Sequence, residues 1–312
     1  MAIKNQTLVT EIILLGFTLD PTINAVLFVL FLTIYIVTIA GNSLIISIIL
    51  THSHLHVPMY YFLCMLSVFD LSYSSTAVPR LLADLFSTER IISISGCVIQ
   101  IYVILLLEGC ECLLLAIMAY DRYVAICQPL HYPLLMRWSI CYRLTAMIFF
   151  LSFMMCIFPS IFTPVVLCGN RINHFMCEIL AILTLSCDNI SSNEAVIFSI
   201  SFLSLFFPFI LIIISYACIL SSVLKIQSAG RAKAFSTCSS HLAVVGLYFG
   251  TVMLMYFGPS SQYSTNQEKY SSIFYVIVSP MLNPVIYSLN NREVKETFQK
   301  ILSKTNSAPL TH

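Results

Sequence analysis

The sequence predicts an all-α membrane protein, a seven-transmembrane helix bundle with a short amphipathic C-terminal helix. Three observations support this fold class: 59% of the 312 residues are hydrophobic, 9% are charged, and the apolar residues gather in seven long runs. In soluble domains roughly a quarter of all residues are charged, and they cover the surface that faces water. The composition therefore excludes a soluble enzyme, a nucleic-acid-binding protein and a disordered chain, and the net charge of +1 provides no field that attracts polyanions.

The seven apolar runs approach the length of about 20 residues that an α-helix needs to cross a bilayer. They do not alternate as the strands of a membrane β-barrel do. We expect spans at residues 25–50, 58–79, 98–120, 141–166, 195–224, 236–257 and 271–289. A single domain, 1–312, then comprises an extracellular tail at 1–24, the helix bundle at 25–289 and a cytoplasmic tail at 290–312.

The basic residues set the expected orientation. With the N-terminus outside, ten of the 15 lysines and arginines lie on the cytoplasmic side, as the positive-inside bias favours. Glycosylation sequons begin at Asn5 in the outer tail and at Asn189 in the longest outer connection. We therefore expect a multi-pass plasma-membrane protein with an extracellular N-terminus and a cytoplasmic C-terminus.

The segment after the last span predicts a helix on the inner membrane surface. Val294, Phe298, Ile301 and Leu302 recur at a spacing that places them on one helical face. Such an amphipathic helix lies in the interface with its apolar face toward the acyl chains.

Two acids in neighbouring spans form a candidate ion or proton site. Asp70 lies midway along the second span and Glu111 midway along the third, and two adjacent carboxylates cannot both ionise cheaply. They either share a proton or hold a monovalent cation such as sodium, with help from Ser67 or Asn42. An equally weighted alternative is a protonated pair that only joins the helices. A proton relay that also includes Glu108, as in a transporter, ranks below both.

A candidate switch lies at the inner ends of the third and seventh spans. An ion pair between Asp121 and Arg122 can hold one helix arrangement, and breaking it frees the guanidinium for a new partner. The plainer interpretation is that Arg122 only follows the positive-inside bias. In the seventh span Pro284 removes a backbone hydrogen bond and kinks the helix. Asn283 is then expected to satisfy the freed carbonyl, and Tyr287 is free to swing.

Several motifs occur in order along the chain. They include GN at 41–42, PMYYFL at 58–63, MAYDRYVAIC at 118–127, KAFSTCSSHL at 233–242 and PMLNPVIYSL at 280–289. With these motifs the chain resembles the olfactory (odorant) receptors of the rhodopsin-like G-protein-coupled family, terrestrial-vertebrate subtype. The resemblance covers roughly the whole chain.

The resemblance implies a receptor that is not an enzyme. It implies that a small volatile odorant binds within the bundle and that the receptor activates a heterotrimeric G protein of the olfactory stimulatory type, raising cyclic AMP. On activation Arg122 is expected to leave Asp121 and meet Tyr216 and Tyr287, while His241 and Lys233 change partners.

The resemblance also implies two disulfide bonds in the outer loops. The pairs are Cys97–Cys177, which ties the long loop to the third span, and Cys168–Cys187 within that loop. Either bond rigidifies a lid over the helix mouth. We interpret His174, near Cys177, as an ordinary loop histidine rather than a metal ligand, and no cofactor is predicted.

By the same resemblance, the odorant binds between spans three, five, six and seven, below the outer loop. The expected lining is Ile104, Leu105, Glu108, Gly109, Cys112, Ile200, Ser201, Ser204, Phe249, Val252, Met253, Tyr256, Ile273 and Val276. A lining that is mostly apolar with a few hydroxyls suits a small, weakly polar ligand. Glu108 favours an amine if ionised and donates to a carbonyl or alcohol if neutral; alternatively it only bonds a neighbouring helix.

Three rival functions differ in what they require. A receptor for a lipid or peptide is favoured by a long charged outer tail, and this tail is short. A transporter requires substrate flux. An enzyme requires a nucleophile–base or metal-ligand constellation, and the cysteines and histidines lack such spacing.

Overall fold

The structure is a computed structural model that describes residues 9–18, 20–162, 167–187, 191–225, 228–257, 265–290, 294 and 297. The side chains of 159–162, 191–194, 197, 228–237, 254–257, 265–268 and 288–290 are outside this description. The predicted sequons at Asn5 and Asn189 also lie outside the described residues. So does the predicted C-terminal helix, apart from Val294 and Thr297, which are helical and buried.

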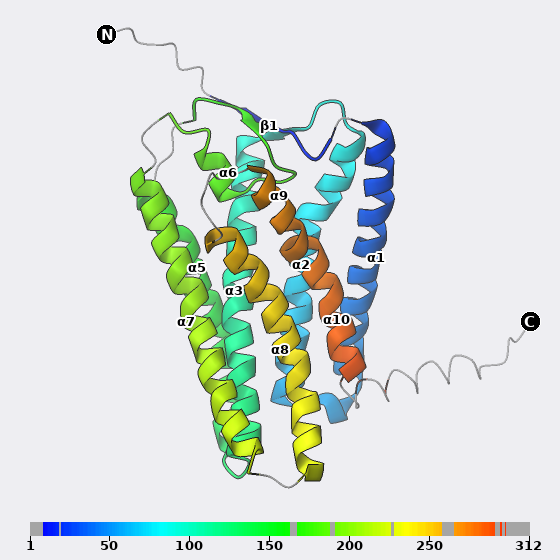
Figure 1. Ribbon diagram of the computed structural model, residues 1–312, viewed down its shortest axis with the longest axis vertical. Coiled ribbons are helices and arrows are strands. Elements are labelled where there is room, and N and C mark those ends of the chain that lie inside the picture. Colours follow the sequence, from blue (N-terminus) through cyan, green and yellow to red (C-terminus); the bar gives the residue numbers. More distant parts are fainter. Residues whose placement is uncertain are drawn as a thin grey trace, which may run out of the picture.

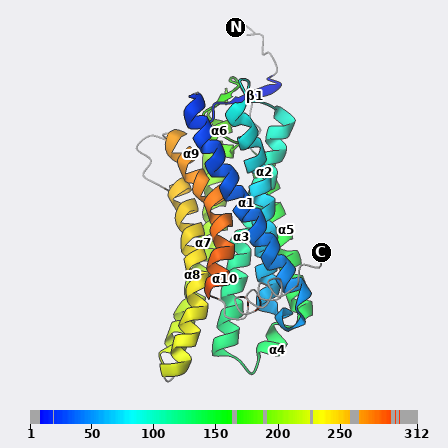
Figure 2. The same ribbon diagram turned by 90° about the vertical axis from the view of Figure 1, so that its right-hand side faces the viewer.

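Long helices run side by side between two ends of the molecule (Figures 1 and 2). They are α1 (Pro21–Thr51), α2 (Pro58–Phe86), α3 (Ile94–Cys127), α5 (Trp138–Phe162), α7 (Ser191–Val223), α8 (Ser228–Phe257) and the pair α9 (Thr265–Ile273) and α10 (Ser279–Asn290). Short helices α4 (Tyr132–Leu135) and α6 (Ile179–Leu183) lie in connections, and a 3₁₀ turn spans Ser53–Leu55. The seven-helix architecture predicted from the sequence is confirmed.

The helices begin where local chemistry favours a start. Asp20 caps α1, because its carboxylate accepts hydrogen bonds from the backbone N–H groups of Thr22 (2.8 Å) and Ile23 (3.2 Å), and Pro21 occupies the first turn, where no N–H is needed. Ser93 caps α3 through the N–H of Gly96 at 3.1 Å. These polar starts were outside the apolar runs, so both helices extend beyond the predicted span boundaries.

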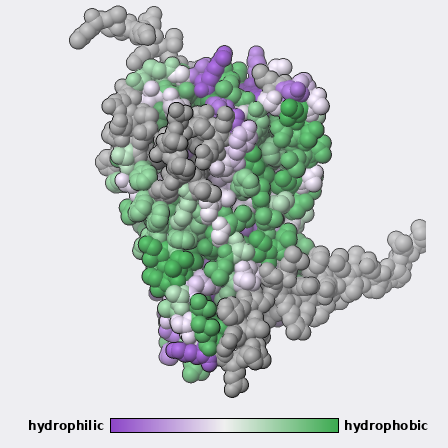
Figure 3. Space-filling model, in the orientation of Figure 1, coloured by the Kyte–Doolittle hydropathy of each residue, from purple (hydrophilic) through white to green (hydrophobic). Residues whose placement is uncertain are grey.

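The surface of the bundle is that of a protein surrounded by lipid. Val26 and Val29 on α1, Phe150 on α5, and Leu203 and Phe207 on α7 are each at least 59% exposed. Figure 3 shows apolar residues over the middle of the molecule and polar residues gathered toward its two ends. Among the described residues, six segments are long and apolar enough to cross a membrane, and the apolar part of α8, Cys238–Met253, is shorter.

The last span, Lys269–Tyr287, is continuously helical where the sequence predicted a helix at 271–289, but it contains an irregular stretch that the sequence did not predict. A π-helical segment, Phe274–Val278, joins α9 to α10, and Pro284 lies inside α10. Because proline has no N–H, the carbonyl of Pro280 loses its helical donor. Asn42 of α1 supplies the replacement, with Nδ2 donating to Pro280 O at 3.0 Å. Gly41 allows α1 to pack this closely against α10, since a Cβ at this position would lie 3.0 Å from Pro284 Cγ.

The predicted role of Asn283 was therefore wrong. Its Nδ2 does not reach a freed carbonyl; it donates to both carboxylate oxygens of Asp70 in α2, each at 3.0 Å. The carbonyl freed by Pro284 faces α1, while Asn283 faces α2, so two different asparagines tie α10 to two neighbours. These bonds matter because a buried polar group without a partner is expensive in lipid.

We predict that Asn42→Ala destabilises the bundle by about 1–3 kcal/mol, because it leaves the Pro280 carbonyl buried without a donor. The midpoint of thermal unfolding in detergent measures this. A matched control is Thr33→Ala, which removes a hydrogen bond to Val29 O on the exposed face of α1. Equal losses for the two variants would contradict a special role for Asn42.

A small sheet covers the mouth of the bundle at one end. The strands are β1 (Glu11–Leu14), β2 (Ile91–Ser93) and β3 (Arg171–Ile172), in the order β2-β1-β3. β1 pairs antiparallel with β2 and parallel with β3. The sequence predicted residues 1–24 to be a tail only, and it missed that this segment supplies the central strand.

Disulfide bonds and basic side chains hold this lid in place. The bonds are Cys97–Cys177 and Cys168–Cys187, the pairing that the resemblance implied. Arg90 donates to the carbonyls of Leu15 (2.6 Å) and Thr18 (2.9 Å). Gly16 between them has a φ of +64°, a conformation that favours glycine. The N-terminal segment is therefore bent inward over the helices.

His174 lies beneath the lid as a neutral ring. It is 1% exposed and stacks on Phe175 at 4.7 Å between ring centroids. Nδ1 accepts a hydrogen bond from the N–H of Met176 (3.2 Å), so Nε2 carries the proton and donates to Ser272 Oγ (3.2 Å) in α9. Burial, together with the charge of Lys269, lowers the pKa of His174 from 6.5 to about 4. The ordinary loop histidine predicted from the sequence is in fact part of the lid's attachment.

We predict that acid destabilises the closed lid between pH 6.5 and pH 4. In this range the ring of an opened lid binds a proton that the closed lid does not, so stability falls by up to about 1.4 kcal/mol for each pH unit. The drop in thermal midpoint from about pH 7.5 to about pH 5 should be smaller in His174→Gln than in the wild type. His131→Gln, at an exposed loop position, is the control and should keep the full drop.

Candidate functional site

A cavity of about 60 Å³ lies among α3, α5 and α7 below the short helix α6. Its lining is Leu105, Glu108, Gly109, Cys112, Met155, Cys156, Ile179, Ile200, Ser201, Ser204 and Leu205. One water molecule needs roughly 10–15 Å³ by this kind of measure, so the space accommodates about four to six waters. A larger guest has to push the lining side chains apart.

The α3 and α7 parts of the predicted lining are in this cavity. Leu105, Glu108, Gly109 and Cys112 recur on one face of α3, and Ile200, Ser201 and Ser204 face them from α7. Ile104 was expected on the same α3 face, but it is 5% exposed within the apolar core. Ile104 and Leu105 are adjacent in the sequence, yet Leu105 lines the cavity and Ile104 packs in the core.

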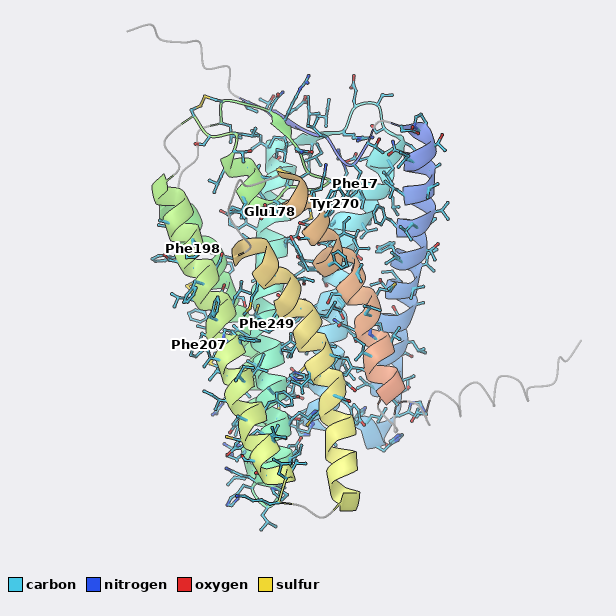
Figure 4. All side chains as sticks on the ribbon, in the orientation of Figure 1. Phe17, Glu178, Phe198, Phe207, Phe249 and Tyr270 are labelled. Atoms are coloured by element: carbon cyan, nitrogen blue, oxygen red, sulfur yellow. A yellow bond between two sulfur atoms is a disulfide. The ribbon has the colours of Figure 1, made fainter. Side chains whose placement is uncertain are left out.

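The α8 and last-span parts of the predicted lining are not in the cavity. Phe249, Val252 and Val276 are at most 1% exposed in the core, and Met253 and Ile273 pack against it. The side chain of Tyr256 lies outside the described residues. In Figure 4, Phe249 lies within the bundle, and Phe198 and Phe207 belong to α7.

Tyr248 explains why α8 stays out of the cavity. Its hydroxyl donates to the backbone carbonyl of Glu108 at 2.9 Å and lies 3.4 Å from Cys112 Sγ. These contacts close the space between α3 and α8. The cavity instead extends toward α5, where Met155 and Cys156 complete the lining. These two residues were not predicted from the sequence, because the fourth span carries no charge or motif that separates a lining side chain from a lipid-facing one.

The carboxyl group of Glu108 is left to the cavity. Tyr248 donates to its backbone carbonyl, but within the described residues no side chain or backbone group bonds its carboxyl oxygens. The alternative in which Glu108 joins a neighbouring helix therefore has no contact to support it. A carboxyl group with free bonding capacity lies in an otherwise mainly apolar space.

The two acids expected to form an ion or proton site have different surroundings. Asp70 is 1% exposed and accepts both hydrogen bonds from Asn283. Glu111 is 4% exposed, and its Oε1 is buried without a partner. Within the described part of the chain, Asn42 Oδ1 and Asn283 Oδ1 are also buried without partners. Each of these oxygen atoms can still accept a hydrogen bond or bind a cation.

The predicted ion pair between Asp121 and Arg122 is absent. Asp121 Oδ1 instead accepts a hydrogen bond from the hydroxyl of Tyr132 in α4 at 2.9 Å. Across the described ranges, the ion pair within 4 Å is Arg80–Asp84, at the lid end of α2. Neighbouring residues on a helix point in different directions, so Asp121 turns toward the connection while Arg122 turns inward and is 7% exposed.

A chain of hydrogen bonds links α7, α8 and α3 near Arg122. His241 Nε2 donates to Leu115 O at 3.1 Å, so Nδ1 is the acceptor for the hydroxyl of Tyr216 at 2.8 Å. Tyr287 is buried, and its hydroxyl has no hydrogen-bond partner among the described residues. The side chain of Lys233 lies outside the described residues. Tyr216 and His241 were both predicted switch residues, but their bond to each other was not foreseen.

A solved structure with the same arrangement of helices defines the class of the fold. The chain superposes on the crystal structure of squid rhodopsin with a TM-score of 0.71, covering 93% of this chain and 88% of that one at 18% identity. At this identity the match shows the fold alone, which is the seven-helix fold of rhodopsin.

The sequence comparisons then give the family. The olfactory receptor family profile matches residues 31–305. Human olfactory receptor 2A12 is 44% identical over 97% of this chain and 99% of its own length. Mouse olfactory receptor 5AR1 is 46% identical over 96% and 98%, respectively. The chain belongs to the olfactory receptor family, a group of multi-pass plasma-membrane signalling receptors that couple a small-molecule ligand to a G protein.

We predict that Met155→Ala shifts the concentration of odorant needed for half-maximal activation by about tenfold, because it removes contacts worth about 1–3 kcal/mol. Met253→Ala is the matched control, since Met253 lies on α8 outside the cavity. Its shift should stay within about twofold. A larger effect of Met253→Ala would favour a cavity on the α8 side, as the resemblance originally implied.

Proposed function

We propose that this receptor detects a small volatile odorant bound between α3, α5 and α7. The observation that carries the proposal is a small apolar cavity with one unpartnered carboxyl group, that of Glu108. Such a space selects by shape and by one or two hydrogen bonds. Ser201 and Ser204 add hydroxyl groups on the opposite wall. A compact ligand with a single polar group matches this distribution.

The state of Glu108 sets the ligand class. In an ionised state it attracts an amine; in a neutral state it donates a hydrogen bond to a ketone, aldehyde or alcohol. Because the cavity is mostly apolar and Glu111 lies one turn away on the same helix, the neutral state is favoured. We therefore assign the receptor to neutral oxygen-containing odorants ahead of amines.

The cavity couples binding to movement. A space of about 60 Å³ must widen for a ligand that exceeds a few heavy atoms, so the ligand binds better to an arrangement in which the helices have separated. A ligand shifts a two-state equilibrium only by this difference in affinity. Tyr248 joins α3 to α8 at the edge of the cavity, which gives a direct path from the widened space to α8.

In the active state, α8 moves outward and the hydrogen bonds at its inner half are exchanged. His241 leaves Leu115 O and Tyr216, two bonds worth about 2 kcal/mol together. The freed Tyr216 hydroxyl and the bare hydroxyl of Tyr287 then meet the guanidinium of Arg122. The inner ends of α3 and α8 separate, and the cleft accepts the C-terminal helix of a G protein of the olfactory stimulatory type, which raises cyclic AMP.

The lid end faces outward in this proposal. Disulfide bonds persist in the oxidising extracellular compartment, and both bonds lie in the lid. The N-terminus is then extracellular and the C-terminus cytoplasmic, with Asn5 and Asn189 as glycosylation sites on the outer side.

A sodium ion is the proposed occupant near Asp70 and Glu111. The support is the set of buried oxygen atoms without partners, Glu111 Oε1, Asn42 Oδ1 and Asn283 Oδ1. A monovalent cation between the acids relieves their mutual repulsion. A shared proton has the same electrostatic effect and is the competing occupant.

The experiment is a cyclic AMP reporter screen against a diverse volatile panel with wild type, Glu108→Gln and Glu108→Leu. We expect neutral oxygen-containing odorants to activate the wild type. Because a glutamine amide still donates a hydrogen bond, Glu108→Gln should keep most of their potency, whereas Glu108→Leu, which has no donor, should lower it by about tenfold. Unchanged potency and selectivity in Glu108→Leu would remove this carboxyl group from ligand recognition.

Arg122→Ala is the control for the signalling step. It should abolish the cyclic AMP response while the receptor remains detectable at the cell surface. A full response from this variant would contradict the proposed role of Arg122 and leave the assignment of the cavity unaffected.

A further inference from the structure

Three aromatic rings form a fixed platform at the end of the bundle opposite the lid, the end that carries α4 (Figure 2). Trp138 and Tyr142, one turn apart on α5, lie 6.0 Å apart with an interplanar angle of 29°. Tyr61 of α2 meets both rings edge-on, at 5.8 Å and 5.7 Å. Its hydroxyl is bonded to Thr145 Oγ1 at 3.0 Å. We call Tyr61, Trp138 and Tyr142 the α2–α5 platform.

The platform faces out of the protein. Trp138 is 40% exposed and Tyr142 is 57% exposed. The outer face of α5 continues toward the lid end with Phe149 and Phe153, which are also exposed. Since the helix is surrounded by lipid, the phenylalanines lie at the level of the acyl chains. The tryptophan and tyrosines then lie at the headgroup level, where these residues are enriched.

Two cations flank the platform. Arg137 immediately precedes Trp138, Arg143 immediately follows Tyr142, and both are exposed. Neither guanidinium has an ion-pair or hydrogen-bond partner within the described part of the chain. The connection at residues 128–137 contains no acid, and Asp121 in α3 is buried and bonded to Tyr132. Among the described residues, the protein therefore supplies two positive charges and no free anion beside an ordered aromatic surface.

A phospholipid is the molecule whose chemistry matches this combination. Guanidinium groups bind phosphate with paired N–H donors, and the acyl chains of the same molecule fit along the phenylalanine face. Charge complementarity decides between lipid classes. The aromatic rings alone would also accept the choline group of a zwitterionic lipid, but two uncompensated guanidinium groups repel that cation and favour a net negative headgroup.

We infer that the α2–α5 platform, with Arg137 and Arg143, is a binding site for an anionic phospholipid. The inference rests on the orientation proposed above in one respect, because anionic lipids are enriched in the cytoplasmic leaflet. The lipid holds the first turn of α5. This turn follows α4, in which Tyr132 donates a hydrogen bond to Asp121. A bound anionic lipid therefore also steadies the connection between α3 and α5, which contacts Asp121 next to Arg122.

The chain contains a single tryptophan, and it lies in the platform. Tryptophan fluorescence of the full-length receptor in proteoliposomes, which contain no second protein, therefore reports on this site directly. The experiment compares quenching by acyl-brominated phosphatidylserine with quenching by acyl-brominated phosphatidylcholine, each at the same low mole fraction in unbrominated phosphatidylcholine. Both leaflets of these liposomes have the same lipid composition, so the result depends neither on orientation in the cell nor on odorant or G-protein coupling.

We expect brominated phosphatidylserine to quench Trp138 at a several-fold lower mole fraction than brominated phosphatidylcholine, since each basic residue enriches an anionic lipid by about fivefold at low salt. Arg137→Gln and Arg143→Gln should each reduce this preference, and the double variant should abolish it. Lys225→Gln, which removes an exposed cation at the end of α7, should retain it.

A second measurement does not depend on variants. In the wild type, the preference should weaken as salt is raised, because the guanidinium charges are exposed to solvent. Equal quenching by the two brominated lipids would overturn the inference. So would a preference that survives in the Arg137→Gln/Arg143→Gln double variant, or one that Lys225→Gln removes to the same extent.

Discussion

The bundle depends on satisfying a backbone carbonyl that Pro284 leaves without a donor inside the membrane. Water is absent from the hydrocarbon region, so only another protein group can supply the hydrogen bond. Asn42 does so from α1, and Asn283, the residue before Pro284, binds Asp70 of α2. These contacts fix α10 against two helices at once. The polar centre that includes Asp70 and Glu111 is built around this fixed point.

The attachment of α8 differs from that of α10. In the described part of α8, Tyr248 and His241 donate to backbone carbonyls of α3, and His241 also accepts a hydrogen bond from Tyr216 of α7. The two carbonyls of α3 keep their place when these bonds break. A helix attached in this way can separate from α3 without unfolding. The cavity lies next to the upper of these attachments, which connects ligand binding to the part of the bundle able to move.

Much of the fold followed from local sequence properties. The apolar runs located the seven helices, because a spanning helix has no other way to satisfy its backbone. The motifs carried the family, and with it the pairing of Cys97 with Cys177. The helix ends could not be placed as well, since Asp20 and Ser93 cap helices from outside the apolar runs. The central strand, Glu11–Leu14, has partners about 80 and 160 residues away, and nothing in a four-residue segment specifies such partners.

The candidate site could be predicted only in part. Helical periodicity correctly grouped Leu105, Glu108, Gly109 and Cys112, because they share one face of α3. It could not say which neighbouring helix faces them, since the reach of Tyr248 across to α3 decides that. Likewise, the sequence placed Asp121 beside Arg122, but the direction of each side chain and the distant hydroxyl of Tyr132 determine the actual partner.

The position of β1 in the middle of the lid has a consequence for biosynthesis. The strand leaves the ribosome before either of its neighbours, and one of them, β3, is made more than 150 residues later. Until then, its backbone groups have no complete sheet to join, and the lid cannot close before most helices have entered the membrane. A shortened chain that starts after residue 18 would bring β2 and β3 together without a strand between them. Its defect would arise during maturation in the endoplasmic reticulum, before any ligand is met.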